Sequence, residues 1–262
     1  MTSAAATAEP PSDPGAAVRV AVIGSTRWAL WWRDELTDDP RFALLTEGET
    51  GKNEPDATVR CEPHGTTIAV PDGPDAEDLP FRPGRFSAEF NAARSALNLS
   101  RKRSPDGPCD FTLIEHTQTP LGDLSAHGTA QGRLEARLDE LLALSGWRSP
   151  SVVHARQQLR GAETTLRAEL FDQETSGTAL IELVRGAAIT WNPGWNVRTP
   201  AGGYFNDTLT TREPGAELAA RLWGGAETSP LDALHAWVSA GDPWPITAEQ
   251  TAAVAVLMTQ IG

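Results

Sequence analysis

The segment from Val18 to Leu45 constrains the fold most, because its residues follow a strand–helix–strand order. The apolar run Val18–Ile23 predicts a buried strand that ends at Gly24. Apolar residues at helical spacing predict a helix over Trp28–Leu36, and Phe42–Leu45 predicts a second strand. This order is typical of the first unit of a Rossmann-like fold.

The turn after the first strand departs from the dinucleotide-binding pattern G-x-G-x-x-G. In that pattern the glycines make the turn and let the backbone approach a pyrophosphate. Only the first glycine is kept here, and bulky Arg27 and Trp28 follow it. We therefore expect no cofactor, and a strand and helix kept for packing. If NADPH binds, the contacting residues are Gly24, Ser25 and Thr26, with Glu47 or Glu49 as the acid that meets the ribose.

Composition excludes several classes of function. The chain has 22 basic and 35 acidic residues and a net charge of −13, which disfavours nucleic acid and anionic membrane as partners. No stretch approaches the roughly 18 to 20 apolar residues of a membrane span. Cys61 and Cys109 have neither metal-ligand nor disulfide-framework spacing, so we expect no metal and a reducing, cytoplasmic location.

The sequence predicts an α/β (α+β) protein in three parts. These are a disordered tail over 1–17, a reduced Rossmann-like unit over 18–83, and an α/β domain with a mainly antiparallel sheet over 84–262. The Gly- and Pro-rich stretch Gly48–Pro83 holds two short strands but is too short for further strand–helix units. Predicted helices of the second domain are Phe86–Leu99, Leu134–Leu144, Glu217–Trp223, Pro230–Ala240 and Thr247–Gln260. Its predicted strands are Asp110–Glu115, Ser151–Leu159, Thr165–Phe171, Thr178–Arg185 and Ala187–Trp191.

Three parts of the chain are similar to the Gfo/Idh/MocA oxidoreductases, and among them to the thiazolinyl imine reductases of siderophore and related peptide biosynthesis. They are Val20–Leu45, the two middle helices (Ala88–Leu97 and Leu134–Trp147), and Ala179–Trp195. The resemblance implies a Rossmann-like unit, a C-terminal sheet that receives substrate, and NADPH-dependent imine reduction as the default activity. The E-H-P motif of the imine reductases is missing from its place. A similar stretch at Glu115–Pro120 follows the helix that it should precede.

Two groups of polar residues are candidates for acid–base chemistry. His116 lies beside Glu115, with His127 on the same expected loop, and an imidazole next to a carboxylate suits proton transfer near neutral pH. The alternative is that these are solvated loop residues. Arg137 and Asp139 lie on the middle helix, where the relatives carry an H-x-x-D-type pair that faces the cleft. An exposed ion pair on that helix is the alternative.

The segment Trp191–Asp207 concentrates aromatic, glycine and asparagine residues, which is unusual for a simple connector. It suits either a pocket for a planar or anionic group or a contact with a partner subunit. The pocket interpretation makes Tyr204 a catalytic residue with His116, Glu115 and Arg137, and gives substrate binding to Arg198, Trp191, Trp195, Asn206 and Asp139. The three tryptophans Trp28, Trp31 and Trp32 favour core packing and hint at a further protein contact.

Three hypotheses about function follow. The first is a non-redox enzyme or enzyme subunit on a degenerate reductase scaffold, which performs an elimination or ring closure on a peptide- or amino-acid-derived intermediate. The second is a non-catalytic partner that stabilises a paralogous subunit. The third is NADPH-dependent thiazolinyl imine reduction. In each case the chain is expected to bind a small-molecule intermediate or a partner, and to form a homo- or hetero-oligomer.

Overall fold

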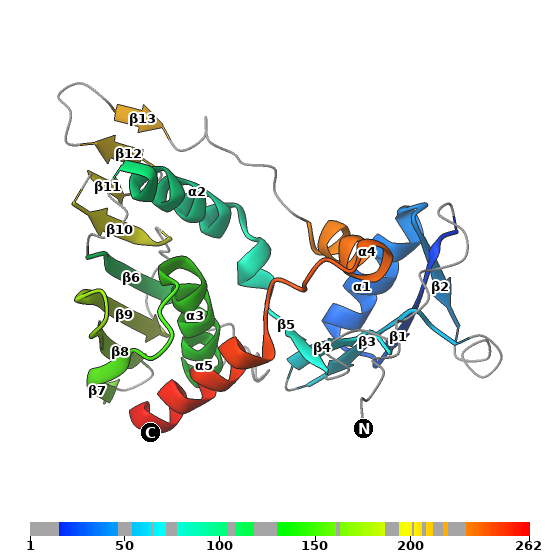
Figure 1. Cartoon of the computed structure of the whole chain (residues 1–262). Helices are drawn as coiled ribbons and strands as arrows, with labels where there is room; N and C mark the ends of the chain where they lie inside the picture. Colours follow the sequence, from blue (N-terminus) through cyan, green and yellow to red (C-terminus); the bar gives the residue numbers. More distant parts are fainter. Residues whose placement is uncertain are drawn as a thin grey trace, which may run out of the picture. The chain divides into compact units, whose positions relative to one another are not determined.

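The computed structural model describes residues 16–46, 54–63, 65–71, 78–103, 108–117, 130–160, 163–186, 194–200, 202–205, 208–211, 217–219 and 229–262. The chain divides into two compact units (Figure 1). Unit 1 is Met1–Phe81 with Thr228–Ala248, and unit 2 is Arg82–Glu227 with Glu249–Gly262. This division differs from the predicted continuous domain over 84–262, because a late segment of the chain groups with unit 1. Most of the predicted tail, 1–15, lies outside the described residues.

Unit 1 contains, in its described residues, a five-stranded sheet in the order β2-β1-β3-β4-β5. Both β2 and β3 run parallel to β1, whereas β4 and β5 are antiparallel to their neighbours. The strand–helix–strand prediction is therefore confirmed, and the sheet then continues as antiparallel strands. The elements are β1 (Val18–Ile23), α1 (Arg27–Asp38), β2 (Phe42–Leu45), β3 (Ala57–Glu62), β4 (Gly65–Ala69) and β5 (Leu79–Phe81).

Helix α1 packs on this sheet through an aromatic cluster. Its buried residues are Ala29, Trp32 and Leu36, at the spacing of one helix face. The ring of Trp32 lies 5.1 Å from that of Phe81 in β5, in an edge-to-face arrangement. Trp28 and Trp31 pack on the same phenylalanine at 5.6 and 6.1 Å between ring centroids. The three tryptophans thus take part in core packing.

Helix α4 (Pro230–Ala240) belongs to unit 1 although it lies far along the sequence. It begins with a capping box, in which Ser229 accepts from the backbone of Asp232 and the Asp232 side chain accepts from the Ser229 backbone. Arg41 forms ion pairs with Asp39 (2.6 Å) and Asp232 (2.8 Å), so it joins this helix to the start of β2. Trp237 is one of the buried residues of this helix.

Unit 2 has an eight-stranded sheet among the described residues, in the order β13-β12-β11-β10-β6-β9-β8-β7. Its pairs are antiparallel except for β6 with β9, as the prediction of a mainly antiparallel sheet requires. The strands are β6 (Asp110–Thr117), β7 (Ser151–Arg160), β8 (Glu163–Asp172), β9 (Gly177–Arg185), β10 (Asn196–Thr199), β11 (Gly202–Phe205), β12 (Thr208–Thr211) and β13 (Glu217–Ala219).

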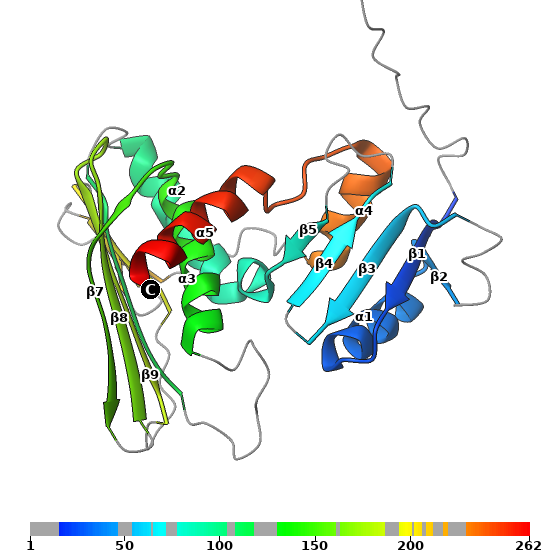
Figure 2. The ribbon, with the colours of Figure 1, turned by 90° about the horizontal axis from the view of Figure 1, so that it is seen from below.

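The helices of unit 2 lie along one face of the sheet (Figure 2). They are η1 (Pro83–Phe86), α2 (Ala88–Arg103), α3 (Ala130–Ser145) and α5 (Ala248–Ile261). The core forms between this face and the helices, with Phe111 and Leu113 of β6 beside Leu138 and Leu141 of α3 and Leu257 of α5. No described helix has both the length and the apolar character that crossing a membrane requires.

One predicted element has the wrong type. The helix expected over Glu217–Trp223 is contradicted by β13, which pairs with β12 over Glu217–Ala219. Alternating and helical spacing cannot be told apart over so few residues, and the pairing with β12 decides the conformation. The strand expected over Ala187–Trp191 lies outside the described residues.

Candidate functional site

Glu115 lies at the centre of a cluster of charged residues beneath α3. Residues of β6 alternate between the two faces of the sheet, and Glu115 shares the helix-covered face with Phe111 and Leu113. Its side chain is 2% exposed and contacts two guanidinium groups of α3. Arg137 donates to Oε2 from Nε at 2.9 Å, and Arg133 Nη2 lies 2.7 Å from Oε1.

The same arginine holds a second buried carboxylate. Arg137 Nη1 donates to both oxygens of Glu140, each at 2.7 Å, across three residues of the helix. Trp195, which precedes β10, donates from Nε1 to Glu140 Oε2 at 2.8 Å. A side chain at Gly84 would overlap Glu140 Oε1, so η1 closes over this carboxylate at a glycine. We call Glu115, Arg133, Arg137, Glu140 and Trp195 the buried charge network.

The network neutralises its own charges. Burial lowers the pKa of Arg137, but the nearby carboxylates of Glu140 and Glu115 raise it by more, so the net shift is upward. The guanidinium therefore stays charged between the two carboxylates. This arrangement ties β6, α3 and the segment before β10 together.

A second pair, Arg85 with Asp139, lies beside the network. Arg85 Nη1 is 3.3 Å from Asp139 Oδ2, and the two side chains are 7% and 1% exposed. Gln250 of α5 donates to the main-chain oxygen of Asp139 at 3.0 Å. Asp139 Oδ1 has no hydrogen-bond partner among the described residues. Burial raises the pKa of Asp139 above its ordinary value, against the opposing effect of Arg85 and Arg82, so this carboxyl binds a proton more readily than an exposed one.

The predicted pairing of Glu115 with His116 is wrong. Both residues belong to β6 and not to a loop, and adjacent strand residues point to opposite faces. Glu115 faces α3, whereas His116 lies on the face without helices, so the carboxylate cannot orient the imidazole. His127 lies outside the described residues.

Arg137 and Asp139, predicted as one pair, have different partners. Arg137 binds Glu115 and Glu140, whereas Asp139 binds Arg85. Sequence reasoning missed Arg85, because no local pattern links it to a helix more than fifty residues later. Glu140 had a signal in its three-residue distance from Arg137, which suits a helical ion pair.

The residues expected to line one aromatic pocket are divided by the sheet. Trp195 is 2% exposed and faces the helices. Arg198 is exposed on the other face of β10, opposite Asp110 of β6 in the strand register, so it does not share a pocket with Trp195. Tyr204 lies in β11 opposite Val197, and its side chain is outside the described residues. Trp191, Asn206 and Asp207 are outside them too.

The turn between β1 and α1 is closed by backbone and capping contacts. Gly24 has φ +113°, and a Cβ there would overlap the main-chain oxygen of Cys61, so glycine is required. Thr26 caps α1 by accepting from the Ala29 backbone at 3.3 Å. The expected obstruction by Arg27 and Trp28 is not the arrangement found, since Arg27 is exposed and Trp28 packs on Phe81. Glu47 and Glu49 lie outside the described residues.

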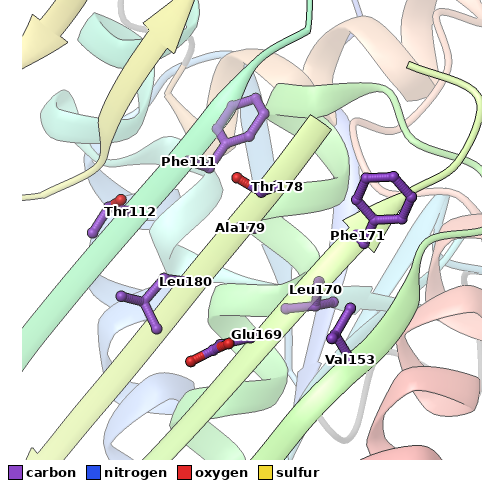
Figure 3. Close-up of a pocket in the computed structure, with 9 residues that line it drawn as sticks. All are labelled: Phe111, Thr112, Val153, Glu169, Leu170, Phe171, Thr178, Ala179 and Leu180. Atoms are coloured by element: carbon purple, nitrogen blue, oxygen red, sulfur yellow. The ribbon is translucent and has the colours of Figure 1, made fainter. Parts of the chain in front are cut away.

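A shallow hollow of about 520 Å³ lies on unit 2 over β6, β7, β8 and β9 (Figure 3). Phe171, Leu180, Val153 and Thr112 contribute to its lining, and Glu169 is its one charged side chain. Glu169 is already paired with Arg167 at 2.7 Å. No predicted site residue lines this hollow, and no group of His, Cys, Asp or Glu within the described residues has the arrangement of a metal site.

Comparisons with known proteins address the fold. No protein-family model and no curated protein matches the chain. Among solved structures it is similar to a putative myo-inositol dehydrogenase from Sinorhizobium meliloti 1021, with TM-score 0.64, 13% identity, and 93% of this chain and 97% of that chain covered. The fold of the chain is therefore similar to that of this oxidoreductase structure. The Gfo/Idh/MocA resemblance implied such a fold.

Two further structures agree. UDP-N-acetylglucosamine 3-dehydrogenase GnnA from Acidithiobacillus ferrooxidans has TM-score 0.58 and 12% identity, with 93% of this chain and 96% of that chain covered. A putative oxidoreductase from Bacteroides fragilis has TM-score 0.60 and 11% identity, with 94% and 96% covered. At such identities the likeness concerns the fold alone, and the link to thiazolinyl imine reductases stays a prediction.

Proposed function

We propose that this chain is a non-redox enzyme subunit on an oxidoreductase fold, which performs acid–base chemistry on a peptide- or amino-acid-derived intermediate. The observation that carries the non-redox part is the sheet of unit 1. Dinucleotides bind across two parallel halves of a doubly wound sheet. In the described residues only β1, β2 and β3 are parallel, and β4 and β5 continue as antiparallel strands. Antiparallel strands thus stand where the second parallel half of such a sheet would continue, which supports a non-redox role.

Asp139 is the group best suited to acid–base work in the described part of the chain. Its Oδ1 has no hydrogen-bond partner among the described residues, its pKa is raised by burial, and Arg85 lies close enough to stabilise the carboxylate left after proton donation. In an elimination or ring closure, Oδ1 would give its proton to the leaving oxygen or nitrogen as the bond from carbon to that atom breaks, so that water or ammonia departs. The proton lost from the neighbouring carbon, or from the attacking nucleophile in a ring closure, would return to Oδ1. Because the side chain is 1% exposed, this role requires the segment around Arg85 to move when substrate binds.

The substrate class and the heteromeric state rest on the sequence resemblance to enzymes of siderophore and peptide biosynthesis. A cytoplasmic location is part of the same proposal. It is supported by the two buried cysteines, Cys61 and Cys109, which form no disulfide and so suit a reducing compartment.

Product mass tests the reaction type. The full chain, co-expressed with the proteins encoded beside its gene, is compared with an Asp139→Asn variant and a Glu174→Gln control, which changes an exposed carboxylate of the same unit. We expect a product lighter than its precursor by water or ammonia. The Asp139→Asn variant should form it about 10²–10⁴ times more slowly, and the control should match wild type. Full activity of a folded Asp139→Asn variant would overturn the catalytic role of Asp139. It would favour the hypothesis that the chain is a non-catalytic partner.

NADPH-dependent reduction is the second candidate, and a specific observation favours it. Gly24, Ser25 and Arg27 are exposed where α1 begins, and helix N-termini with a nearby arginine suit phosphate groups. The same mass measurement separates the candidates, because a reduction adds two hydrogens and depends on added NADPH.

A further inference from the structure

Strand β7 forms one edge of the sheet in unit 2. It is ten residues long and stands last in the strand order, and seven of its residues, His154–Arg160, follow one regular register with β8 (Figures 1 and 2). Its outer side has no strand partner within the described residues. An edge of this length presents a row of backbone N–H and C=O groups that suit another strand.

The edge has few of the features that block strand addition. Its sequence contains neither proline nor lysine. A bulge between Val152 and His154 affects only its first residues, and Gln260 of α5 accepts from the backbone of Val152 alone. Val153 and Leu159 are 65% and 73% exposed, which makes them two of the five exposed large apolar residues in the described chain. The remaining strand is open and partly apolar.

A row of charged residues crosses β7, β8 and β9, and its members in β8 and β9 are paired whereas its member in β7 is not paired within the described residues. Arg156 lies opposite Arg167 of β8, which in turn lies opposite Glu182 of β9. Arg167 is already paired, with Glu169 at 2.7 Å and Glu182 at 3.7 Å. Arg156 thus has a like charge on its inner side, and no ion pair to it occurs within the described residues. An acidic residue on an added strand would complete this row.

We propose that β7 binds an extended, acidic segment of another polypeptide, which pairs with it as an additional strand. The sequence of β7 carries Arg156 and Arg160 but no acidic residue, although the chain as a whole has a net charge of −13. A second copy of β7 would bring the same basic strand against itself, so charge complementarity favours a different, acidic partner. This surface is independent of the proposed role of Asp139.

Fluorescence anisotropy with the full chain tests the charge requirement. The probe is a labelled peptide of alternating valine and glutamate, compared with the same peptide carrying lysine for glutamate. We expect the acidic peptide to bind at least about tenfold more tightly. Arg156→Glu should remove this preference or reverse it, whereas Arg148→Glu, an exposed charge reversal outside the strand, should not. Equal binding of both peptides, or no effect of Arg156→Glu, overturns the proposal.

Amide hydrogen exchange tests the strand geometry. The acidic peptide should slow exchange along residues 153–160, and a peptide with prolines in place of valines should not, because it lacks the backbone donors. Unchanged exchange along β7 overturns the proposal. If β7 becomes protected without peptide as the protein concentration rises, its edge pairs with a second copy of the chain. That result also overturns the proposal.

Discussion

Replacing Arg137 by leucine probes the buried charge network directly. Leucine at this position of α3 fills space with an apolar side chain. It removes the cation between Glu115 and Glu140, which are both 2% exposed. Removing one partner of a buried ion pair costs about 3–5 kcal/mol, because the remaining charge loses its compensation. We expect the free energy of unfolding of unit 2 to fall by that amount, and its melting temperature to fall by roughly 6–20 °C.

The loss should depend on pH. In the variant Glu115 keeps Arg133, but Glu140 keeps only the neutral donor Trp195. The buried carboxylate of Glu140 should then take up a proton more readily in the folded chain than in the unfolded chain. The deficit relative to wild type is therefore largest at neutral pH and narrows as the pH falls toward about 4.5. Urea unfolding followed by tryptophan fluorescence measures it, with Arg167→Leu as control. The ion pair of Arg167 with Glu169, whose side chains are 33% and 38% exposed, is worth under ~1 kcal/mol. A loss no larger than the control's, or one independent of pH, would refute this account of the network.

Two further predictions concern unit 1. Gly24→Ala should lower its free energy of unfolding by at least about 2 kcal/mol, because the residue has a positive φ and a Cβ there would overlap a main-chain oxygen. Gly65→Ala, with open space around the residue, should change it by under ~0.5 kcal/mol. Urea midpoints measure both variants, and equal effects would count against the turn geometry. Hydrogen bonds from Arg41 hold the pKa of Asp39 and of Asp232 below the ordinary 3.8. Arg41→Gln should therefore destabilise unit 1 at pH 7, and this deficit should shrink as the pH falls below 3.8. Melting curves across pH check it, and a constant deficit would exclude the ion pairs as its cause.

Much of the fold could be predicted because its signals are local. The apolar run, the turn glycine and the amphipathic helix of the first unit follow one another within thirty residues, and the antiparallel strands β7, β8 and β9 are separated by short turns. The prediction failed where distant residues decide the structure. No local sequence pattern near Glu217–Ala219 indicates its pairing with β12, and none in α4 indicates that this helix belongs to unit 1.

The site shows the same limit. Glu115 and Arg137 were each predicted as functional residues, but for separate reasons, and only the packing of α3 on β6 brings them together. Strand alternation could have shown that Glu115 and His116 face opposite ways, had the strand been extended by two residues. Arg85 could not be found, because its contact with Asp139 depends on how η1 meets α3.

The most direct test of the central claim is a calorimetric titration of the full chain with NADPH. Because the sheet of unit 1 has a single parallel half among the described residues, we expect no saturable heat of binding at NADPH concentrations up to about 1 mM. We also expect no rise in melting temperature at the same concentration. A dissociation constant below about 10 μM, accompanied by such a rise, would contradict the non-redox assignment and make the chain a nicotinamide-dependent reductase.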